Sequence, residues 1–197
     1  MVKGKDTKKA ILVKGLDMAS AVGLQNVTIG SLAKAMNMSK SGLFAHFNAK
    51  ENLQVEILAY AGQLFAAEVV LPALKVERGI SRIQALVDNW IHWSSKLSGG
   101  CIFVSASTEF SELQGRVRDY LLKQQKMWQD SLRRIAQSAI KAGEFRTDSD
   151  CDQFAYDFYS FLLGFHYYDR LLKDPQIGDR KNTALHQLLN TYRNPAD

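Results

Sequence analysis

The sequence predicts an all-α protein in which a small N-terminal domain, residues 1–48, precedes a larger helical domain, residues 49–197. Only three prolines occur, which leaves long stretches free to be helical. Apolar residues recur at helical spacing, and no alternating strand pattern with hairpin turns stands out. A third observation is the stretch from Thr28 to Leu53, which carries the start and stop signals of successive short helices.

The first helix is expected to begin at Asp6 or Thr7 and to stop at Gly23, which suits a left-handed C-terminal position. Three helices of this size cannot each bury an apolar stripe alone, so we expect the first three to pack on one another. The buried face of the first helix is expected to consist of Ile11, Leu12, Gly15, Met18, Ala19 and Val22.

Thr28 is a favourable N-cap for the second helix, and Asn37 suits the positive φ of a sharp helix stop. Ser39 then caps a third helix, on which Leu43 and Phe47 lie four residues apart on one face. Two helices joined by a short turn form the helix-turn-helix unit, whose second helix enters the DNA major groove. The N-terminal domain is therefore predicted to be a three-helix helix-turn-helix domain.

The fourth helix is expected to begin at Asn48, with Glu51 completing a capping box, and to end near Val70 before Pro72. It starts in the DNA-binding unit and ends in the larger domain, so it is the expected mechanical link between the two. Further helices are expected at residues 79–97, 101–110, 112–142 before Gly143, from Ser149 with Asp152 to about 172, and 179–193.

The basic residues are concentrated in the N-terminal quarter of the chain. The first 50 residues hold eight lysines against Asp6 and Asp17, a net charge of +6, whereas the whole chain carries +5 and the remainder therefore −1. Cations placed there would meet DNA phosphates and release counterions. A solvated lysine tail that only aids solubility is the alternative, and coincidence with the helix-turn-helix pattern favours DNA.

Two cysteines far apart, Cys101 and Cys151, give neither metal-ligand spacing nor a disulfide framework, which indicates a reducing, cytoplasmic setting. Cys101 has no lysine or arginine adjacent in sequence, so it is expected to be inert rather than a redox sensor. No apolar run approaches the ~20 residues that a membrane helix needs, and no signal peptide is recognisable. We therefore expect no membrane partner, no metal and no other cofactor.

The segment from Thr28 to Leu53 contains the Thr cap, Leu32-Ala33, the Ser39 turn, Gly42-Leu43-Phe44, His46-Phe47 and Lys50-Glu51-Asn52-Leu53. Through these residues it resembles the DNA-binding signature of tetracycline-repressor family regulators. The family often has Gly where Asn37 stands and Tyr where Phe44 stands, so one hydroxyl contact to a phosphate is expected to be lost. GCIFVSASTEF, a long helix and AGEFRTDSD resemble one common group of the family's C-terminal domains.

The resemblance implies that the third helix lies in the major groove, with its DNA-facing residues pointing away from Leu43 and Phe47. Two of the residues predicted to contact phosphates have an alternative interpretation: Thr28 would serve only as a helix cap, and His46 would be only a core residue. The predicted base-facing residues are Ser39, Lys40, Ser41 and Gly42, with Ala45 placed to touch a thymine methyl group. The predicted backbone contacts are Thr28, His46 and Lys50, with Phe44 in the same surface.

The resemblance also implies a homodimer on an operator with two inverted half-sites, usually a repressor released when a small molecule moves the fourth helix. Residues 158–168 are apolar nearly all round, which favours pairing with a second copy over burial within one chain. The expected interface residues are Leu162, Phe165, Tyr168, Leu185, Leu188 and Leu189. A largely apolar effector is expected to contact aromatic residues that would otherwise be plain core, namely Trp90, Trp93, Phe103, Phe110, Trp128, Phe158 and Phe161.

Two other classes of function are weaker interpretations. A helical-bundle enzyme with a di-iron site needs Glu three residues before His, and none of the four histidines has one. Asp88 with His92, and His166 with Asp169, each give half a metal site at most. A helix-turn-helix interaction module without operator binding is the second alternative, and the basic N-terminal domain argues against it. The sequence thus predicts a non-enzymatic regulator that binds double-stranded DNA, an unknown effector and a second copy of itself.

Overall fold

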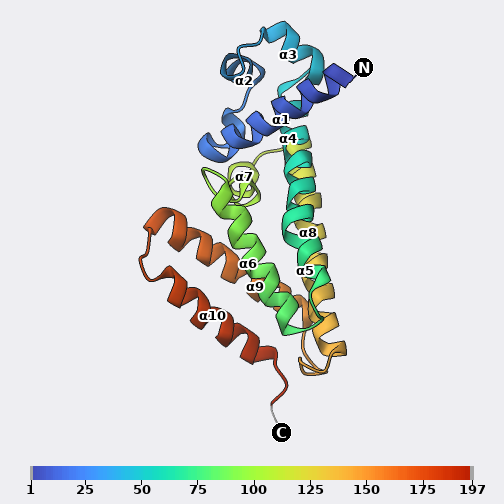
Figure 1. Ribbon diagram of the computed structural model, residues 1–197, viewed down its shortest axis with the longest axis vertical. Helices are drawn as coiled ribbons and strands as arrows, with labels where there is room; N and C mark the ends of the chain where they lie inside the picture. The colour runs from blue at the N-terminus through green and yellow to red at the C-terminus, as the bar shows by residue number, and fades with distance from the viewer. Residues whose placement is uncertain (1, 196–197) are drawn as a thin grey trace. The chain divides into compact units, whose positions relative to one another are not determined.

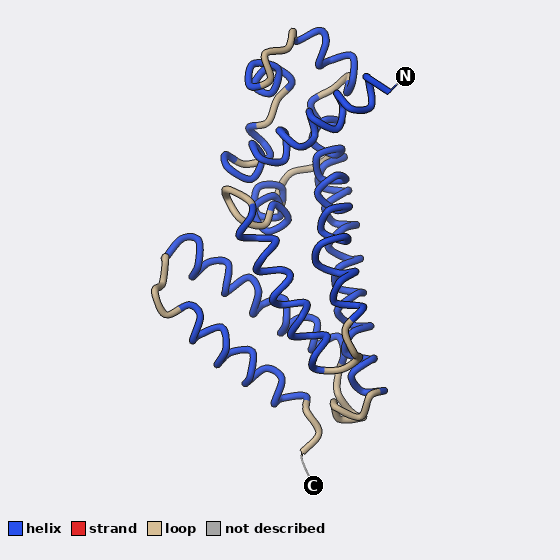
Figure 2. The backbone as a smooth tube through the Cα atoms, viewed as in Figure 1, coloured by secondary structure: helices blue, strands red, loops and turns tan. Residues whose placement is uncertain are grey.

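The protein is helical in the part described by the computed structural model, in which the backbone spans residues 2–195 and the side chains residues 6–195. Figure 2 shows these helices joined by short turns, and the described residues contain no strand beyond an isolated bridge between Phe145 and Arg193. The predicted all-α class is confirmed. Lys3 and Lys5, which contribute to the predicted basic surface, have side chains outside the described residues.

The chain divides into two compact units. One unit contains Met1–Ala66 and Trp93–Gln124, and the other contains Ala67–His92 and Gln125–Asp197. Each unit therefore draws on two separate segments of the sequence. The expected boundary at residue 48 separates the DNA-binding domain from the rest of the chain, which is a different division from these two units, and it stays a prediction.

The first unit is built on α1, which packs on α2, α4 and α7 (Figure 1). α1 begins at Val2 rather than at Asp6 or Thr7, because no proline interrupts these lysine-rich turns and lysine favours a helix. Val22 was expected to be buried but is 56% exposed, in the last turn before Gly23 redirects the chain. The elements of this unit are α1 (Val2–Val22), η1 (Leu24–Asn26), α2 (Ile29–Ala35), α3 (Lys40–Phe47), α4 (Lys50–Phe65), α7 (Ile102–Phe110) and the start of α8 (Arg116–Lys141).

The junction between α3 and α4 differs from the prediction at Asn48. This residue ends α3 with a φ of 61°, and Ala49 is the residue at the N-cap position of α4. Only two residues separate the helices, so Asn48 makes the left-handed turn and cannot also serve as the extended cap of α4. The predicted capping box with Glu51 is therefore wrong.

The second unit begins where α4 continues through a π-helical segment, Ala66–Val70, into α5, Leu71–Lys75. Pro72 was expected to end this helix, but it lies in the first turn of α5, directly after the π-helical segment, and the helix continues past it to Lys75. α8 starts at Arg116, four residues later than expected, after Gly115 with a φ of 118°. The remaining elements are α6 (Ile80–Lys96), most of α8, α9 (Cys151–Tyr167), η3 (Tyr168–Leu172) and α10 (Ile177–Tyr192).

The helical stretch Lys50–Lys75 is long and apolar enough, by length and composition, to cross a membrane, with a mean hydropathy of 1.6 over its most apolar part. No apolar run of this length was expected from the sequence, because polar residues such as Gln54 and Glu56 interrupt the stretch. Its polar residues are used within the protein, since Glu56 pairs with Lys8 and Gln54 binds backbone carbonyls. Length and composition alone do not distinguish such a helix from one that packs inside a protein.

α9 and α10 lie side by side in the second unit (Figure 1). The rings of Phe145, Phe154 and Tyr192 pack together, with centroids 5.2 to 5.7 Å apart. The side chain of Asp150, not that of Ser149 as expected, caps α9 by accepting two backbone N–H groups. Asp is the stronger cap here because its carboxylate complements the positive end of the helix dipole.

Candidate nucleic-acid interface

α2 begins at a complete capping box centred on Thr28. The Thr28 hydroxyl accepts the backbone N–H of Ser31 at 3.0 Å, and the Ser31 hydroxyl accepts the backbone N–H of Thr28 at 2.9 Å. These bonds satisfy N–H groups that otherwise lack partners in a first helical turn. The predicted cap is confirmed, and the phosphate contact of Thr28 stays a prediction.

The turn between α2 and α3 follows the predicted chemistry. Asn37 has a φ of 53°, the left-handed conformation of a helix stop. The Ser39 hydroxyl then accepts the backbone N–H of Gly42 at 3.1 Å and caps α3. A Cβ atom on residue 42 would lie 3.0 Å from that hydroxyl, so glycine leaves room for the cap. Both ends of the turn are thus defined by local hydrogen bonds.

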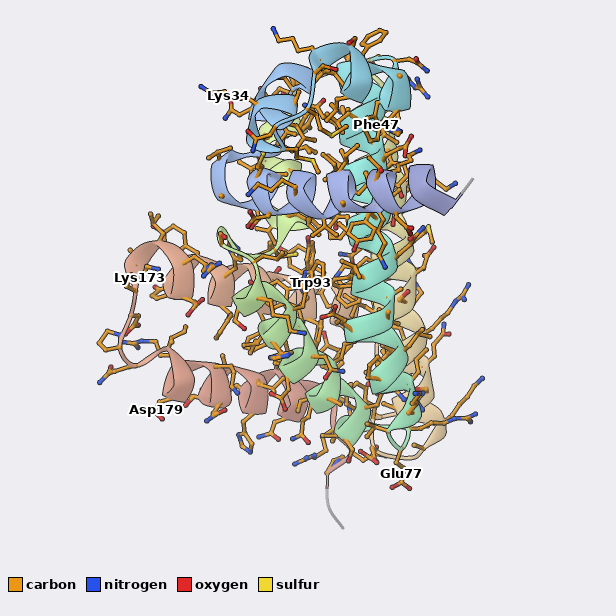
Figure 3. The ribbon with its side chains drawn as sticks, turned by 45° about the horizontal axis from the view of Figure 1, so that its top comes forward. Lys34, Phe47, Glu77, Trp93, Lys173 and Asp179 are labelled. Atoms are coloured by element: carbon orange, nitrogen blue, oxygen red, sulfur yellow. The ribbon has the colours of Figure 1, made fainter. Side chains whose placement is uncertain are left out.

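α3 has one buried side and one exposed side. Leu43 and Phe47 are 0% and 2% exposed and face the other helices of the N-terminal domain; Figure 3 labels Phe47 there, with Lys34 pointing outward. The Lys8 ammonium lies 5.5 Å from the centre of the Phe47 ring, a cation–π contact. The opposite side presents the exposed residues Lys40, Ser41, Phe44 and Ala45. Packing thus fixes the orientation of a helix whose outward side chains are accessible.

Phe44 is 50% exposed on this outward side. An exposed phenyl ring has no hydrogen bond to offer a phosphate, but apolar contact with a thymine methyl group is one of the ways in which side chains read base edges. His46 is only half-buried, and its ring centre lies 6.1 Å from that of Phe47. Both side chains therefore remain available to a ligand from outside.

The lysines of the N-terminal domain fall into two groups. Lys8 pairs with Glu56 at 2.5 Å and Lys14 pairs with Asp17 at 3.1 Å, so both have partners within the protein. Lys34, Lys40 and Lys50 are exposed and have no carboxylate partner among the described residues. These three lie on α2, α3 and α4, and they are the cations that the helix-turn-helix surface presents.

The Lys40 side chain reaches back from α3 to the first turn of α2. A Cβ atom on Gly30 would lie 3.1 Å from Lys40 Cε and 3.7 Å from its Nζ. The ammonium group therefore lies close to the helix end that Thr28 caps. The arrangement brings a positive charge and polar groups to one edge of the exposed surface, beside the start of α2.

Two family models match the sequence. The model described as "Bacterial regulatory proteins, tetR family" matches residues 11–57, and "Tetracyclin repressor-like, C-terminal domain" matches residues 79–185. The chain belongs to the tetracycline-repressor family. Its helix-turn-helix is therefore the DNA-binding element of a bacterial transcriptional regulator, and the predicted fold class is confirmed in full.

Several solved structures share this fold, among them two transcriptional regulators of the tetracycline-repressor family. The protein from Cytophaga hutchinsonii has a TM-score of 0.88 at 18% identity, covering 100% of this chain and 99% of its own. One from Chloroflexus aurantiacus has a TM-score of 0.81 at 21% identity, covering 96% of each chain. AibR, solved in complex with isovaleryl coenzyme A and operator DNA, has a TM-score of 0.72 at 21% identity, covering 95% and 98%. The comparison with curated proteins gives no match.

The aromatic residues predicted to contact an effector occur in both units of this tetracycline-repressor family protein. In the first unit, Trp93 and Phe103 each lie edge-on to Phe65, with ring centroids 5.9 and 5.8 Å apart. In the second unit, Trp90 packs edge-on against Phe165 at 6.4 Å. The other predicted residues are Phe110 and Phe158, which are buried, and Trp128 and Phe161, which are half-buried.

The indole N–H of Trp93 is buried and has no hydrogen-bond acceptor among the described residues. The group that it approaches is the thiol of Cys101, and sulfur is a weak acceptor. Burial raises the pKa of Cys101, which keeps this thiol protonated and poorly nucleophilic. Among the predicted effector residues, Trp93 is thus the one with a buried, unsatisfied hydrogen-bond donor.

The residues predicted at a dimer interface divide by exposure. Leu162 and Leu189 are 0% and 3% exposed within the single chain, so little of their surface remains for a partner. Phe165, Leu185 and Leu188 are half-buried, and Tyr168 is exposed. A cavity of about 270 Å³ also opens in this region, lined by Phe161, Gly164, Phe165, Tyr168, Ile177, Arg180, Lys181 and Ala184.

The two residue pairs that could each supply half of a metal site do not form one. Asp88 lies 3.8 Å from the Lys181 ammonium. His166 has a buried Nε2 without a hydrogen-bond partner in the described part of the chain. Across residues whose side chains are described, no group of three histidines, cysteines or carboxylates is placed to hold a metal ion.

Sequence reasoning missed the residues that hold the helix-turn-helix from behind. Gln54 donates to the backbone oxygen of Leu24 at 2.8 Å, and Asn52 donates to the backbone oxygen of Phe47 at 2.9 Å. Arg116, at the start of α8, donates in turn to the Asn52 side-chain oxygen at 2.5 Å. The contacts of Gln54 and Arg116 join residues 30 and 64 positions apart, so no local spacing in the sequence signals them.

Proposed function

We propose that this protein is a dimeric repressor that binds an operator of two inverted half-sites through α3 and leaves it when a small, largely apolar ligand binds. The observation that most strongly supports this proposal is that α3 has two distinct sides. Leu43 and Phe47 lie on a buried side, and Lys40, Ser41 and Phe44 lie on an exposed side. Such a helix can enter the major groove without disturbing the core that orients it. Because its target is chromosomal DNA, its proposed location is the cytoplasm.

The proposed contacts divide into base readers and backbone contacts. Lys40 and Ser41 are suited to base edges, and Phe44 and Ala45 to thymine methyl groups. Lys50 at the start of α4, with Thr28 and His46, is suited to phosphates on either side of the groove. With few long base-reading side chains, DNA shape and backbone contacts carry much of the proposed specificity.

The proposed dimer rests on the apolar surface of α9 and η3. Tyr156 and Leu171 are 67% and 68% exposed, and Leu163, Tyr167 and Leu172 are also exposed. Large apolar side chains gathered on one helix are typical of a surface that a partner covers. Pairing with a second copy would present two α3 helices to half-sites about one DNA turn apart.

The proposed effector has an apolar body and at least one hydrogen-bond acceptor. The aromatic residues near Trp93 favour the apolar part, and its buried indole N–H favours the acceptor. The complex of AibR with isovaleryl coenzyme A and operator DNA supports an effector that combines an acyl group with polar atoms. Release requires that the ligand bind the DNA-incompetent conformation more tightly than the competent one.

The test measures the affinity of charge-reversed variants for DNA selected by the wild-type protein. Lys40→Glu and Lys50→Glu are each expected to weaken binding by at least about tenfold and to reduce the salt dependence. The exposed Lys126 on α8 provides the matched control, and Lys126→Glu is expected to bind as the wild type does. Equal loss in all three variants, or no loss in any, contradicts the assignment of α3.

The competing proposal is an interaction module that does not recognise an operator. It predicts that the wild-type protein binds DNA weakly, without sequence preference, and only at low salt. A selected consensus sequence that competes against random DNA at physiological salt excludes this alternative. We propose no enzymatic activity for the chain.

A further inference from the structure

The short turn η1, which leads from α1 to α2, is held by a carboxylate from α7. The backbone N–H groups of Leu24 and Gln25 donate to the two Glu109 carboxylate oxygens at 3.1 and 2.8 Å. The Gln25 side chain also donates to the Glu109 backbone oxygen at 2.6 Å. A charged acceptor on two consecutive amides is among the stronger arrangements available to a hydrogen bond.

The opposite polar groups of the same turn are held by α4. The Gln54 side-chain amide donates to the backbone oxygens of Leu24 and Val27, at 2.8 and 3.4 Å. Gln54 is 2% exposed, so these bonds form away from water. η1 is therefore bound through its N–H groups by α7 and through its carbonyl groups by α4.

The chain before α7 is fastened to the end of α1. The Ser20 hydroxyl accepts the backbone N–H of Gly99 at 2.8 Å and donates to the backbone oxygen of Gly100 at 3.2 Å. A Cβ atom on residue 99 would lie 1.7 Å from the Ser20 backbone oxygen, so only glycine permits this approach. Both ends of α7 are thus attached to the segment that runs into the helix-turn-helix, and Figure 1 shows α7 beside α1.

Gly23, the residue before η1, leaves room for the Glu109 carboxylate. This residue has a φ of 89°, and a Cβ atom there would lie 3.1 Å from both Glu109 carboxylate oxygens. A glycine therefore provides both the left-handed backbone and the space that the carboxylate occupies. The backbone at this turn therefore leaves the space in which the Glu109 carboxylate binds.

We propose that Glu109 is a positioning residue for DNA binding, which acts by holding η1 and thereby the start of α2. Thr28, the cap of α2, follows η1 after a single residue, so a change at the turn is passed directly to α2 and α3. α7 is then a second connection to the DNA-reading helices, beside α4. The inference rests on the proposed function because its consequence is read through DNA affinity.

The test compares hydrogen exchange in Glu109→Ala, Glu109→Gln and Glu112→Gln. Glu112 is exposed in the turn after α7, and Glu112→Gln removes the same charge as Glu109→Gln without touching η1. We expect exchange of backbone amides in residues 24–35 to be at least about tenfold faster in Glu109→Ala and intermediate in Glu109→Gln, which keeps one acceptor. Glu112→Gln is expected to match the wild type.

Two further readouts distinguish positioning from general stability and from the proposed function. Exchange in residues 151–192 is expected to be unchanged in both Glu109 variants, and affinity for the selected DNA is expected to fall at least about fivefold. Wild-type exchange in residues 24–35 of Glu109→Ala, equal acceleration in both regions, or faster exchange with unchanged affinity each overturns the inference. Absence of specific DNA binding by the wild type instead overturns the proposed function, and the exchange comparison still decides whether Glu109 holds η1.

Discussion

The DNA-reading helices and the C-terminal helices differ in how completely a single chain buries their large apolar side chains. In α2 and α3, Leu32, Leu43 and Phe47 are buried, and Phe44 is the large apolar residue left exposed. In α9 and η3, by contrast, several large apolar side chains are exposed, with Leu171 at 68%. The comparison indicates that one chain completes the DNA-reading surface, whereas the C-terminal surface is completed by the proposed second copy.

The largest expected effect is loss of the dimer in Leu171→Asp. A carboxylate buried in an apolar interface is expected to weaken association by about 3 kcal/mol or more. Analytical ultracentrifugation over a range of protein concentrations measures this change. Leu122→Asp, at a position 44% exposed on α8, is the control and is expected to leave the dimer intact. An unchanged sedimentation coefficient for Leu171→Asp would contradict the proposed interface.

The second prediction concerns the buried side of α3. Leu43→Ala is expected to lower the free energy of unfolding by about 2–5 kcal/mol, because it leaves a cavity at a site that is 0% exposed. Phe44→Ala, on the other side of the same helix, is expected to change stability by about 0.5 kcal/mol or less. Urea unfolding of both variants provides the measurement. Similar losses from the two substitutions would show that α3 lacks distinct faces.

A smaller effect is expected at the start of α2. Thr28→Ala removes the hydroxyl of the capping box and is expected to cost about 1 kcal/mol of stability, with Thr28→Ser restoring most of it. Thermal unfolding measures both. If Thr28→Ala lowered DNA affinity without any loss of stability, the residue would act as a phosphate contact rather than as a cap.

The smallest predicted effect is a pH dependence in the second unit. Burial lowers the pKa of His166, the charge of Arg170 lowers it further, and Asp169 partly opposes the shift. As the pH falls below about 6.5, the unfolded state binds this proton before the folded state does. The stability contributed by neutral His166 is therefore present above about pH 6.5 and is lost as the pH falls towards the folded-state pKa.

His166→Gln is expected to reduce this acid-side loss, measured as the melting temperature between about pH 8 and pH 5. His186 is exposed on α10, so His186→Gln is the control and is expected to keep the wild-type slope. Identical slopes in all three proteins would show that His166 does not couple protonation to folding.

Local chemistry explains why the helix-turn-helix was predictable from sequence. The roles of Thr28, Asn37 and Ser39 depend on residues within three positions, and all three were predicted correctly. Asn48 was assigned wrongly because asparagine suits both the left-handed end of one helix and the cap of the next. The two-residue spacing between α3 and α4 decides between these roles, and it is visible only once both helix ends are known.

Long-range contacts explain what the sequence did not reveal. Glu109 lies more than 80 residues from the amides that it binds, and no periodicity in the sequence relates the two segments. The apolar character of residues 158–168 was evident, but it did not show that Leu162 packs inside the chain while Leu163 is exposed. That distinction depends on how α9 is rotated against its neighbours, which is a property of the folded protein.

The most direct test of the central claim, that the exposed side of α3 reads DNA, is selection of bound sequences from random DNA by the wild type and by Ser41→Arg. We predict an inverted repeat for the wild type, and for Ser41→Arg the same repeat with a new preference for guanine at one symmetric pair of positions. An unchanged consensus for Ser41→Arg, or no consensus for the wild type, would contradict the account.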